Sequence, residues 1–212
     1  LTYDEVKAHH LDAQVLMNTT PRGMFAQEKG MSIDPALFPH LEGAVDAIYN
    51  PLRTEFILAA RKQGARAAGG LYMLVCQGVL ASEIFLDTKY PEGTAEGIYR
   101  KIKSGKENIV LTGMPGSGKS TVGKLLSEKL DRPYLDVDTL ITEKTGKTPA
   151  ELISAEGEQA FRDRESEVIR SIALETGAVI ATGGGAVLRE ENCNALRMNG
   201  KIFFLDRPVE QL

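Results

Sequence analysis

Cysteine and histidine are scarce in this sequence, which holds two cysteines and three histidines among 212 residues. Cys76 and Cys193 lie far apart and fit neither a disulfide framework nor a metal-binding spacing, so a disulfide-stapled scaffold is excluded. We expect them to be reduced, buried thiols of a cytoplasmic protein. His9, His10 and His40 show no ligand spacing either, and we expect them at solvated positions or helix ends.

The sequence also lacks long apolar runs and an excess of basic residues. No segment approaches the roughly 20 apolar residues of a membrane span, and no signal peptide is recognisable. Lys and Arg total 25 against 29 Asp and Glu, a net charge of −4 without the basic field that a nucleic-acid backbone requires. We therefore expect neither a membrane nor a nucleic acid as partner, and the oligomeric state stays open.

The composition is that of an ordinary globular chain, with 42% hydrophobic and 25% charged residues, and the length allows one large domain or two small ones. The pattern favours two, residues 1–90 and 108–212, joined by a polar linker at residues 91–107. The chain opens at Leu1 rather than Met and closes at Leu212 just after a strand-like run. We expect it to be part of a longer sequence.

The first segment combines short apolar runs with two helical patterns. Runs at Gln14–Met17 and Gly43–Ile48 are each followed by a turn that contains proline. A helix around Phe56–Gln63 should end at the next glycine, and Leu71–Leu86, apolar nearly all round, should form a helix that packs on both sides. Strands that alternate with helices predict a parallel α/β layer.

The second segment has a sharper pattern, preceded in the linker by a possible short helix around Ala95–Ile102. Apolar runs separated by helical stretches again predict a parallel sheet with flanking helices. The expected strands are Ile109–Thr112, Pro133–Asp136, Ala178–Ala181 and Lys201–Leu205, and the clearest helices are Ser120–Leu130 and Glu158–Leu174.

A glycine-rich loop follows the first of these strands and opens a helix. Residues 113–120, Gly-Met-Pro-Gly-Ser-Gly-Lys-Ser, match the spacing of a phosphate-binding loop in the structural context that such a loop needs. Glycines let successive N–H groups turn toward phosphate oxygens, and the helix N-terminus adds its dipole. Lys119 would place a positive charge at the β- and γ-phosphates, and Ser120 would offer a hydroxyl to Mg²⁺. The loop predicts a nucleoside triphosphate site.

Two carboxylates follow the second strand, at Asp136 and Asp138. Residues two apart on a strand share a face, so both can point into the crevice at the carboxyl end of the sheet, where ligands of open α/β sheets bind. One could serve a metal and the other a substrate hydroxyl. Alternatively, Asp138 caps the N-terminus of a helix that begins at Thr139; the two roles are compatible.

Two further features could shape the acceptor side. Composition alone favours Arg162 and Arg164 as solvated surface charges. If either guanidinium lay in a crevice, it would instead bind a carboxylate through two hydrogen bonds. Phe161 and Glu165 belong to the helical stripe that we assign to the core. The buried strand at residues 178–181 runs into Gly183, Gly184 and Gly185, and close approach of a small ligand explains three glycines better than a plain loop does.

Taken together, residues 108–212 resemble shikimate kinase, with the phosphate loop, Asp-x-Asp, Phe-Arg-x-x-Glu and Gly-Gly-Gly in order and at family-like spacing. The resemblance implies a P-loop nucleoside-kinase-like fold that stops before the family's lid and adenine-contacting loop. It implies catalytic roles for Lys119 and Asp138, and Mg²⁺ at Ser120 and Asp136. The implied binding residues are, for ATP, Gly113, Gly116, Ser117, Gly118, Lys119, Ser120 and Thr121 and, for shikimate, Asp138, Arg162 and Gly184.

Residues 1–90 are similar to the C-terminal part of shikimate dehydrogenase, on the stretches Met17–Met24, Asp46–Leu52 and Gly69–Gln77. The resemblance implies a partial Rossmann-like segment whose catalytic Lys/Asp pair and dinucleotide loop belong to upstream sequence. It implies NADP near Asn18, Thr19 and Gly70, and the dehydrogenase substrate at Tyr49 and Gln77. Taken without the resemblance, these last two would be a core residue and a helix surface residue.

The two resemblances together imply an enzyme that catalyses two consecutive reactions. NADPH-dependent reduction of 3-dehydroshikimate would give shikimate, and ATP with Mg²⁺ would convert shikimate to shikimate 3-phosphate. Three alternatives stay open. The chain could bind ATP without turnover, belong to a related P-loop kinase for another hydroxylated acid, or keep these motifs as relics in an interaction segment.

Overall fold

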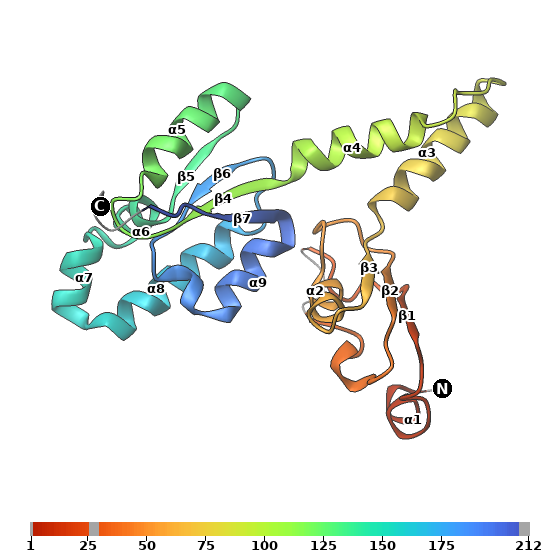
Figure 1. Cartoon of the computed structure of the whole chain (residues 1–212), viewed down its shortest axis with the longest axis horizontal. Helices are drawn as coiled ribbons and strands as arrows, with labels where there is room; N and C mark the ends of the chain where they lie inside the picture. The colour runs from red at the N-terminus through yellow and green to blue at the C-terminus, as the bar shows by residue number, and fades with distance from the viewer. Residues whose placement is uncertain (1, 26–29, 208–212) are drawn as a thin grey trace. The chain divides into compact units, whose positions relative to one another are not determined.

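The computed structural model describes residues 2–25 and 30–207 and divides the chain into two units, Leu1–Ser104 and Gly105–Leu212. Each unit contains its own parallel sheet with helices around it, which confirms the predicted α/β class (Figure 1). Across the described residues no helix has both the length and the apolarity needed to cross a membrane.

The second unit is built on a four-stranded parallel sheet in the order β5-β6-β4-β7. Its strands lie within one or two residues of their predicted positions, and β4 pairs with β6 on one side and β7 on the other. Because the strands are parallel, the loops after β4, β5 and β6 leave the same edge. The strands are β4 Asn108–Thr112, β5 Tyr134–Asp136, β6 Val179–Ala181 and β7 Gly200–Phe204.

Helices cover both faces of this sheet, with α5 on one side and α8 and α9 on the other (Figure 1). The core is apolar, and Val110 and Ile180 of the sheet are fully buried with Ile141, Ile169 and Leu196 of the helices. The helices are α5 Lys119–Leu130, α6 Val137–Thr145, α7 Pro149–Glu156, α8 Glu158–Ile172, the 3₁₀ turn η2 Ala186–Leu188, and α9 Glu190–Asn199.

The first unit holds a three-stranded parallel sheet in the order β1-β2-β3. Strand β3, Arg66–Ala68, was not predicted because Arg-Ala-Ala lacks β-branched residues; pairing with β2 selects its conformation. Phe38 and Ile57 are fully buried in the core. The other elements up to residue 62 are α1 Tyr3–His9, β1 Val15–Asn18, η1 Pro35–Leu37, β2 Gly43–Asp46 and α2 Glu55–Lys62.

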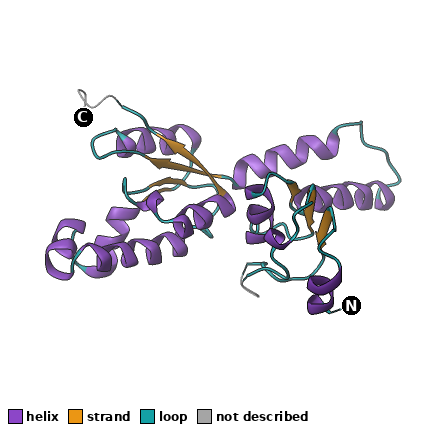
Figure 2. Cartoon of the chain, turned by 60° about the horizontal axis from the view of Figure 1, so that its bottom comes forward, coloured by secondary structure: helices purple, strands orange, loops and turns teal. Residues whose placement is uncertain are grey.

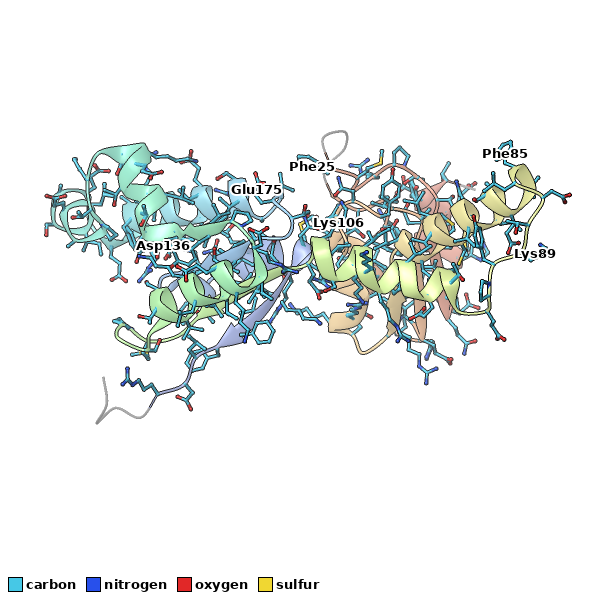
Figure 3. All side chains as sticks on the ribbon, turned by 90° about the horizontal axis from the view of Figure 1, so that it is seen from above. Phe25, Phe85, Lys89, Lys106, Asp136 and Glu175 are labelled. Atoms are coloured by element: carbon cyan, nitrogen blue, oxygen red, sulfur yellow. The ribbon has the colours of Figure 1, made fainter. Side chains whose placement is uncertain are left out.

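Two long helices follow, α3 Leu71–Phe85 and α4 Thr94–Lys106, and the last two residues of α4 lie beyond this unit; both helices are drawn in purple in Figure 2. The prediction that residues 71–86 pack on both sides was wrong: only the first turns of α3 are buried. Phe85 is 86% exposed and projects from the end of the helix in Figure 3. Helix α4 is longer than expected, and an ion pair of 2.7 Å between Arg100 and Glu96, one turn apart, supports it.

The cysteines are free, as predicted, but only half-buried. Cys76 lies on α3, where the apolar sequence led us to expect burial on both sides. Because much of the surface of α3 is exposed to solvent, the thiol of Cys76 is only partly covered.

We predict that Gly70→Ala destabilises the first unit by roughly 3 kcal/mol, the upper range for forcing extra atoms into packed structure. The φ of Gly70, −74°, suits any residue, but an added Cβ would collide with the carbonyl oxygen of Ala47, a backbone atom that cannot swing away. Gly78→Ala, later in α3, is the matched control. Its Cβ meets nothing within 4 Å and should stabilise the helix by about 0.5–1 kcal/mol. Urea denaturation of both variants measures the difference, and equal stabilities would contradict the prediction.

Candidate functional site

The phosphate-binding loop connects β4 to α5 and turns by means of its glycines. Gly118 adopts a left-handed conformation, with φ of 89°, at the N-cap of α5. Gly113 leaves no room for a side chain, because a Cβ there would stand 2.6 Å from the carbonyl oxygen of Leu205. The loop therefore follows the sheet edge closely and presents the free N–H groups of the helix N-terminus beyond it.

Lys119, the first residue of α5, folds back over this loop. Its Nζ donates hydrogen bonds to the carbonyl oxygens of Gly113 at 2.9 Å and Met114 at 2.8 Å. Nearby, the hydroxyls of Thr112 and Ser117 are buried and, within the described residues, have no hydrogen-bond partner. Buried hydroxyls without partners cost free energy that a polar ligand can recover, so the loop suits an anion with several oxygens.

Asp136 ends β5 and caps helix α6. Its Oδ1 accepts hydrogen bonds from the backbone N–H groups of Asp138 at 3.1 Å and Thr139 at 3.3 Å. Its Oδ2 accepts a hydrogen bond of 2.9 Å from the hydroxyl of Tyr134. The suggestion that Asp138 caps a helix from Thr139 was wrong, because α6 begins at Val137 and the carboxylate one residue earlier takes that place.

Asp138 lies in the first turn of α6, where its side chain keeps contact with solvent. Desolvation by the surrounding chain and, second, the charge of Asp136 raise the pKa of this carboxyl, while the charges of Lys119 and Arg162 oppose the rise. The three side chains that the sequence assigns to the site therefore act on one another. They come from three different elements: α5, α6 and α8.

Arg162 is held in place on α8 and is not a solvated surface charge. Its Nη1 donates to Glu165 Oε2 at 2.9 Å, its second terminal nitrogen lies 3.4 Å from Glu158 Oε1, and its guanidinium stacks on the ring of Phe161. Arg164 fits the surface interpretation, since its side chain is 54% exposed and lies 3.6 Å from Glu167. The two arginines of the motif thus have different surroundings.

The sequence did not predict a role in the site for Glu165. It is fully buried, and one of its oxygens, Oε1, has no partner within the described residues. Burial raises the pKa of this carboxyl, and the hydrogen bond from Arg162 lowers it. In the sequence, Glu165 falls in the apolar stripe of its helix, three residues after Arg162. A carboxylate at such a position is the signal that could have revealed the Arg162–Glu165 ion pair.

Each of the three glycines after β6 lies against a different part of the site. A Cβ on Gly183 would stand 2.8 Å from Glu165 Oε1 and 3.5 Å from Asp138 Oδ1, and one on Gly184 would stand 2.9 Å from the carbonyl oxygen of Gly113. A Cβ on Gly185 would collide with the guanidinium of Arg162, whose Cζ would be 2.6 Å away. The glycine run therefore joins the phosphate loop, the carboxylates and the arginine at one edge of the sheet.

The donor set at this edge fits a Mg²⁺ ion that shares its coordination with phosphates. No group of three or more His, Cys, Asp or Glu in residues 2–25 and 30–207 could hold a metal by itself. Ser120 and Asp136 supply a hydroxyl and a carboxylate next to the loop. Mg²⁺ commonly takes one or two such protein oxygens and completes its shell with water and substrate phosphates.

In the first unit, the residues assigned to NADP lie at or near the carboxyl ends of strands. Asn18 is buried at the end of β1, with its Nδ2 3.0 Å from Asp46 Oδ1 and its Oδ1 2.7 Å from the hydroxyl of Thr20. Thr19 beside it is exposed. Gly70, at the start of α3, donates its N–H to the carbonyl oxygen of Ile48 at 2.8 Å.

The two residues assigned to the dehydrogenase substrate are both exposed. Tyr49 follows β2 and is 43% exposed, so the interpretation of this residue as core was wrong. The polypeptide turns immediately after it, which leaves the ring outside the packed layer. Gln77 lies on the surface of α3, as its position in the helix predicted.

Comparison with known proteins finds shikimate kinases. Residues 115–212 match the family model "Shikimate kinase", and this match supports a shikimate kinase domain in that part of the chain. The shikimate kinase of Symbiobacterium thermophilum is 52% identical over 105 residues, which are 50% of this chain and 60% of that enzyme. The chain thus spans about three fifths of the length of this relative.

Two solved structures complete the comparison. The shikimate kinase from Acinetobacter baumannii in complex with shikimate is 40% identical, with a TM-score of 0.50 over 52% of this chain and 62% of that one. A chorismate mutase/shikimate 5-dehydrogenase fusion protein from Clostridium acetobutylicum is 37% identical, with a TM-score of 0.44 over 47% of this chain and 37% of that one.

Proposed function

We propose that the second unit transfers the γ-phosphoryl group of ATP to the 3-hydroxyl of shikimate. The observation that carries the proposal is the junction at Gly183–Gly185, where the phosphate loop, Asp138 and the Arg162–Glu165 pair lie against consecutive residues. The family match over residues 115–212 supports the same reaction. Phosphoryl transfer needs little covalent chemistry from the protein, so positioning and charge neutralisation by these groups would provide the catalysis.

The loop would bind the triphosphate through its N–H groups and Lys119. The ammonium now bonds two backbone carbonyls, and it would exchange them for the β- and γ-phosphates, which carry full charge. Ser120 and Asp136 would hold Mg²⁺, which supplies neutralising charge when bound. The other residues assigned to ATP would contact its phosphates through the backbone: Gly113, Gly116, Ser117, Gly118 and Thr121.

Asp138 would orient the attacking hydroxyl and take its proton. The environment raises its pKa toward the working pH, which favours proton transfer by a carboxylate, and Lys119 and Arg162 limit that rise. Its Oδ1 lies within reach of the glycine junction, so a hydroxyl bound there can meet both the carboxylate and the end of the phosphate loop.

Arg162 would bind the carboxylate of shikimate, with Gly184 allowing the ring to approach the backbone. Planar guanidinium and carboxylate groups match at two points. Glu165 holds one terminal nitrogen at 2.9 Å, while the other makes a longer contact of 3.4 Å with exposed Glu158, which the acid would replace; the Phe161 ring fixes the plane of the guanidinium. The arginine is thereby oriented before the acid arrives, which lowers the entropy lost on binding.

We also propose that the first unit is part of an NADP-dependent shikimate dehydrogenase that converts 3-dehydroshikimate to shikimate. Its sequence resemblance supports this, and so does the position of Asn18, Thr19 and Tyr49 at the carboxyl edge of a parallel sheet, where ligands of such sheets bind. Because the Asn18 amide is engaged inside the protein, it would hold the turn, while exposed Thr19 would contact NADP. Gly70 would approach the nicotinamide, and Tyr49 and Gln77 the substrate.

The proposed kinase function is tested by ATP-dependent phosphorylation of shikimate beside gluconate, with calorimetry of ATP and shikimate on the same protein. We expect ATP to bind and shikimate to be preferred, because Arg162 and Asp138 suit a cyclic acid with hydroxyls. Equal phosphorylation of gluconate would favour a kinase for another hydroxylated acid. ATP binding without turnover would favour a nucleotide-binding segment, and absence of ATP binding would contradict the site.

A further inference from the structure

The side chain of Tyr134 lies between the two residues that we assign to Mg²⁺. Its hydroxyl donates to Asp136 Oδ2 at 2.9 Å and lies next to the side chain of Ser120. Ser120 is the second residue of α5 and Asp136 ends β5, so this one phenol lies between the phosphate loop and the neighbouring strand. The proposed phosphoryl transfer gives Tyr134 no role.

The ring of Tyr134 is seated where the phenol can reach both residues. It lies against α5 at Gly123, so closely that a Cβ on that glycine would stand 2.5 Å from the ring's Cε2. A glycine inside a helix costs about 1 kcal/mol relative to alanine. At Gly123 the missing side chain provides the space for the ring, and the ring's position in turn fixes that of the hydroxyl.

The hydrogen bonds of Asp136 leave it one way to bind a metal. A carboxylate has about four lone-pair sites. Two on Oδ1 receive the N–H groups of Asp138 and Thr139, and one on Oδ2 receives the phenol of Tyr134. The remaining lone pair belongs to Oδ2, the oxygen that Tyr134 holds. Its direction is therefore set by the phenol together with the cap of α6.

The phenol of Tyr134 lies beside the side chain of Ser120 and holds the Oδ2 of Asp136. Partners of this kind, one bond removed from a metal, commonly change metal affinity 10–100-fold.

We propose that Tyr134 is a positioning residue for the divalent metal of the nucleotide site, aligning the Oδ2 of Asp136 for an ion that Ser120 shares. The proposal rests on the proposed function, since it assumes that the loop binds a metal–nucleotide complex. Tyr134→Phe should keep the ring against Gly123 and remove only the hydroxyl with its hydrogen bond to Asp136. It should therefore weaken metal binding about 10-fold and leave the affinity for metal-free nucleotide unchanged.

The experiment measures metal binding apart from turnover. Mn²⁺, which replaces Mg²⁺ in oxygen sites and is visible by electron paramagnetic resonance, is titrated into the full chain saturated with ADP, and ADP affinity without metal is measured by calorimetry. Tyr90→Phe, which loses an exposed 2.9 Å hydrogen bond to Ser82 in the first unit, is the matched control and should behave as wild type. Thermal unfolding shows that each variant is folded.

The results separate this proposal from the proposed function. About 10-fold weaker Mn²⁺ binding in Tyr134→Phe alone, with equal metal-free ADP affinity, supports the positioning role. Equal Mn²⁺ affinity overturns it, and so does an equal loss of ADP affinity with and without metal, because the phenol would then only shape the loop. If the wild-type protein bound ADP neither with nor without metal, the proposed nucleotide site would be wrong. This outcome depends on the wild-type titrations alone and is therefore distinct from the result for Tyr134→Phe.

Discussion

Lys119→Met should reduce phosphoryl transfer from ATP to shikimate by about 10²–10³-fold or more while leaving the fold intact. Methionine keeps much of the length of the side chain but carries no charge, so the negative charge that grows on the transferring group would lose a fixed partner. Removal of a single preorganised donor from a transition state typically has an effect of this size. The hydrogen bonds that Lys119 makes in the structure go to two carbonyls of its own loop, and their loss should cost little stability.

The matched control is Lys124→Met, which removes an exposed lysine from the same helix. It carries the same change in net charge and helix composition, so it should retain near-wild-type turnover. Initial rates at saturating ATP and shikimate, with circular dichroism of each variant, make the comparison. If Lys119→Met kept most of its activity, or if both variants lost it equally, the assignment of Lys119 would be wrong.

Arg162→Lys should weaken shikimate about 50–100-fold and ATP only slightly. Lysine keeps the positive charge but offers a single point of contact in place of a planar fork, and a hydrogen bond to a charged group contributes about 1.5–3 kcal/mol. The substitution also loses the stacking on Phe161 and the 2.9 Å bond to Glu165, so the ammonium would not be held in one orientation. KM for each substrate and calorimetry with shikimate measure the effect.

Arg164→Lys provides the control for this prediction. It lies two residues away on α8, half-exposed beside Glu167, and replacing it makes the same chemical change outside the site. It should leave both KM values within about twofold, as is usual for surface positions. Equal weakening of ATP and shikimate by Arg162→Lys would show that the arginine supports the unit as a whole and does not grip the acid.

The sequence predicted the second unit well because its local signals agree with one another. Apolar runs, glycines and caps marked β4, α5, β5 and β6 to within one or two residues, and the phosphate loop came with its strand and helix. In the first unit β3 lacked any such signal. The position of helix α3 was predicted correctly, but its burial was predicted wrongly. The apolar sequence of a helix does not show which other elements pack against it.

The candidate site was less predictable than the fold, since its key contacts join residues far apart in sequence. The composition of Phe161–Glu165 does not distinguish Arg162 from Arg164; the difference is made by the buried carboxylate one turn later and by the glycines after β6. Similarly, an Asp-x-Asp motif does not show which carboxylate caps the helix. That depends on where α6 begins, which backbone geometry decides.

The three glycines after β6 restrict how the sequence of this loop can vary. A side chain at Gly183 would press on the fully buried Glu165, and one at Gly184 on a backbone carbonyl of the phosphate loop. A side chain at Gly185 would meet the end of the Arg162 side chain, which can move. We therefore expect Gly185 to tolerate replacement better than the two glycines before it, in natural variants and in design alike.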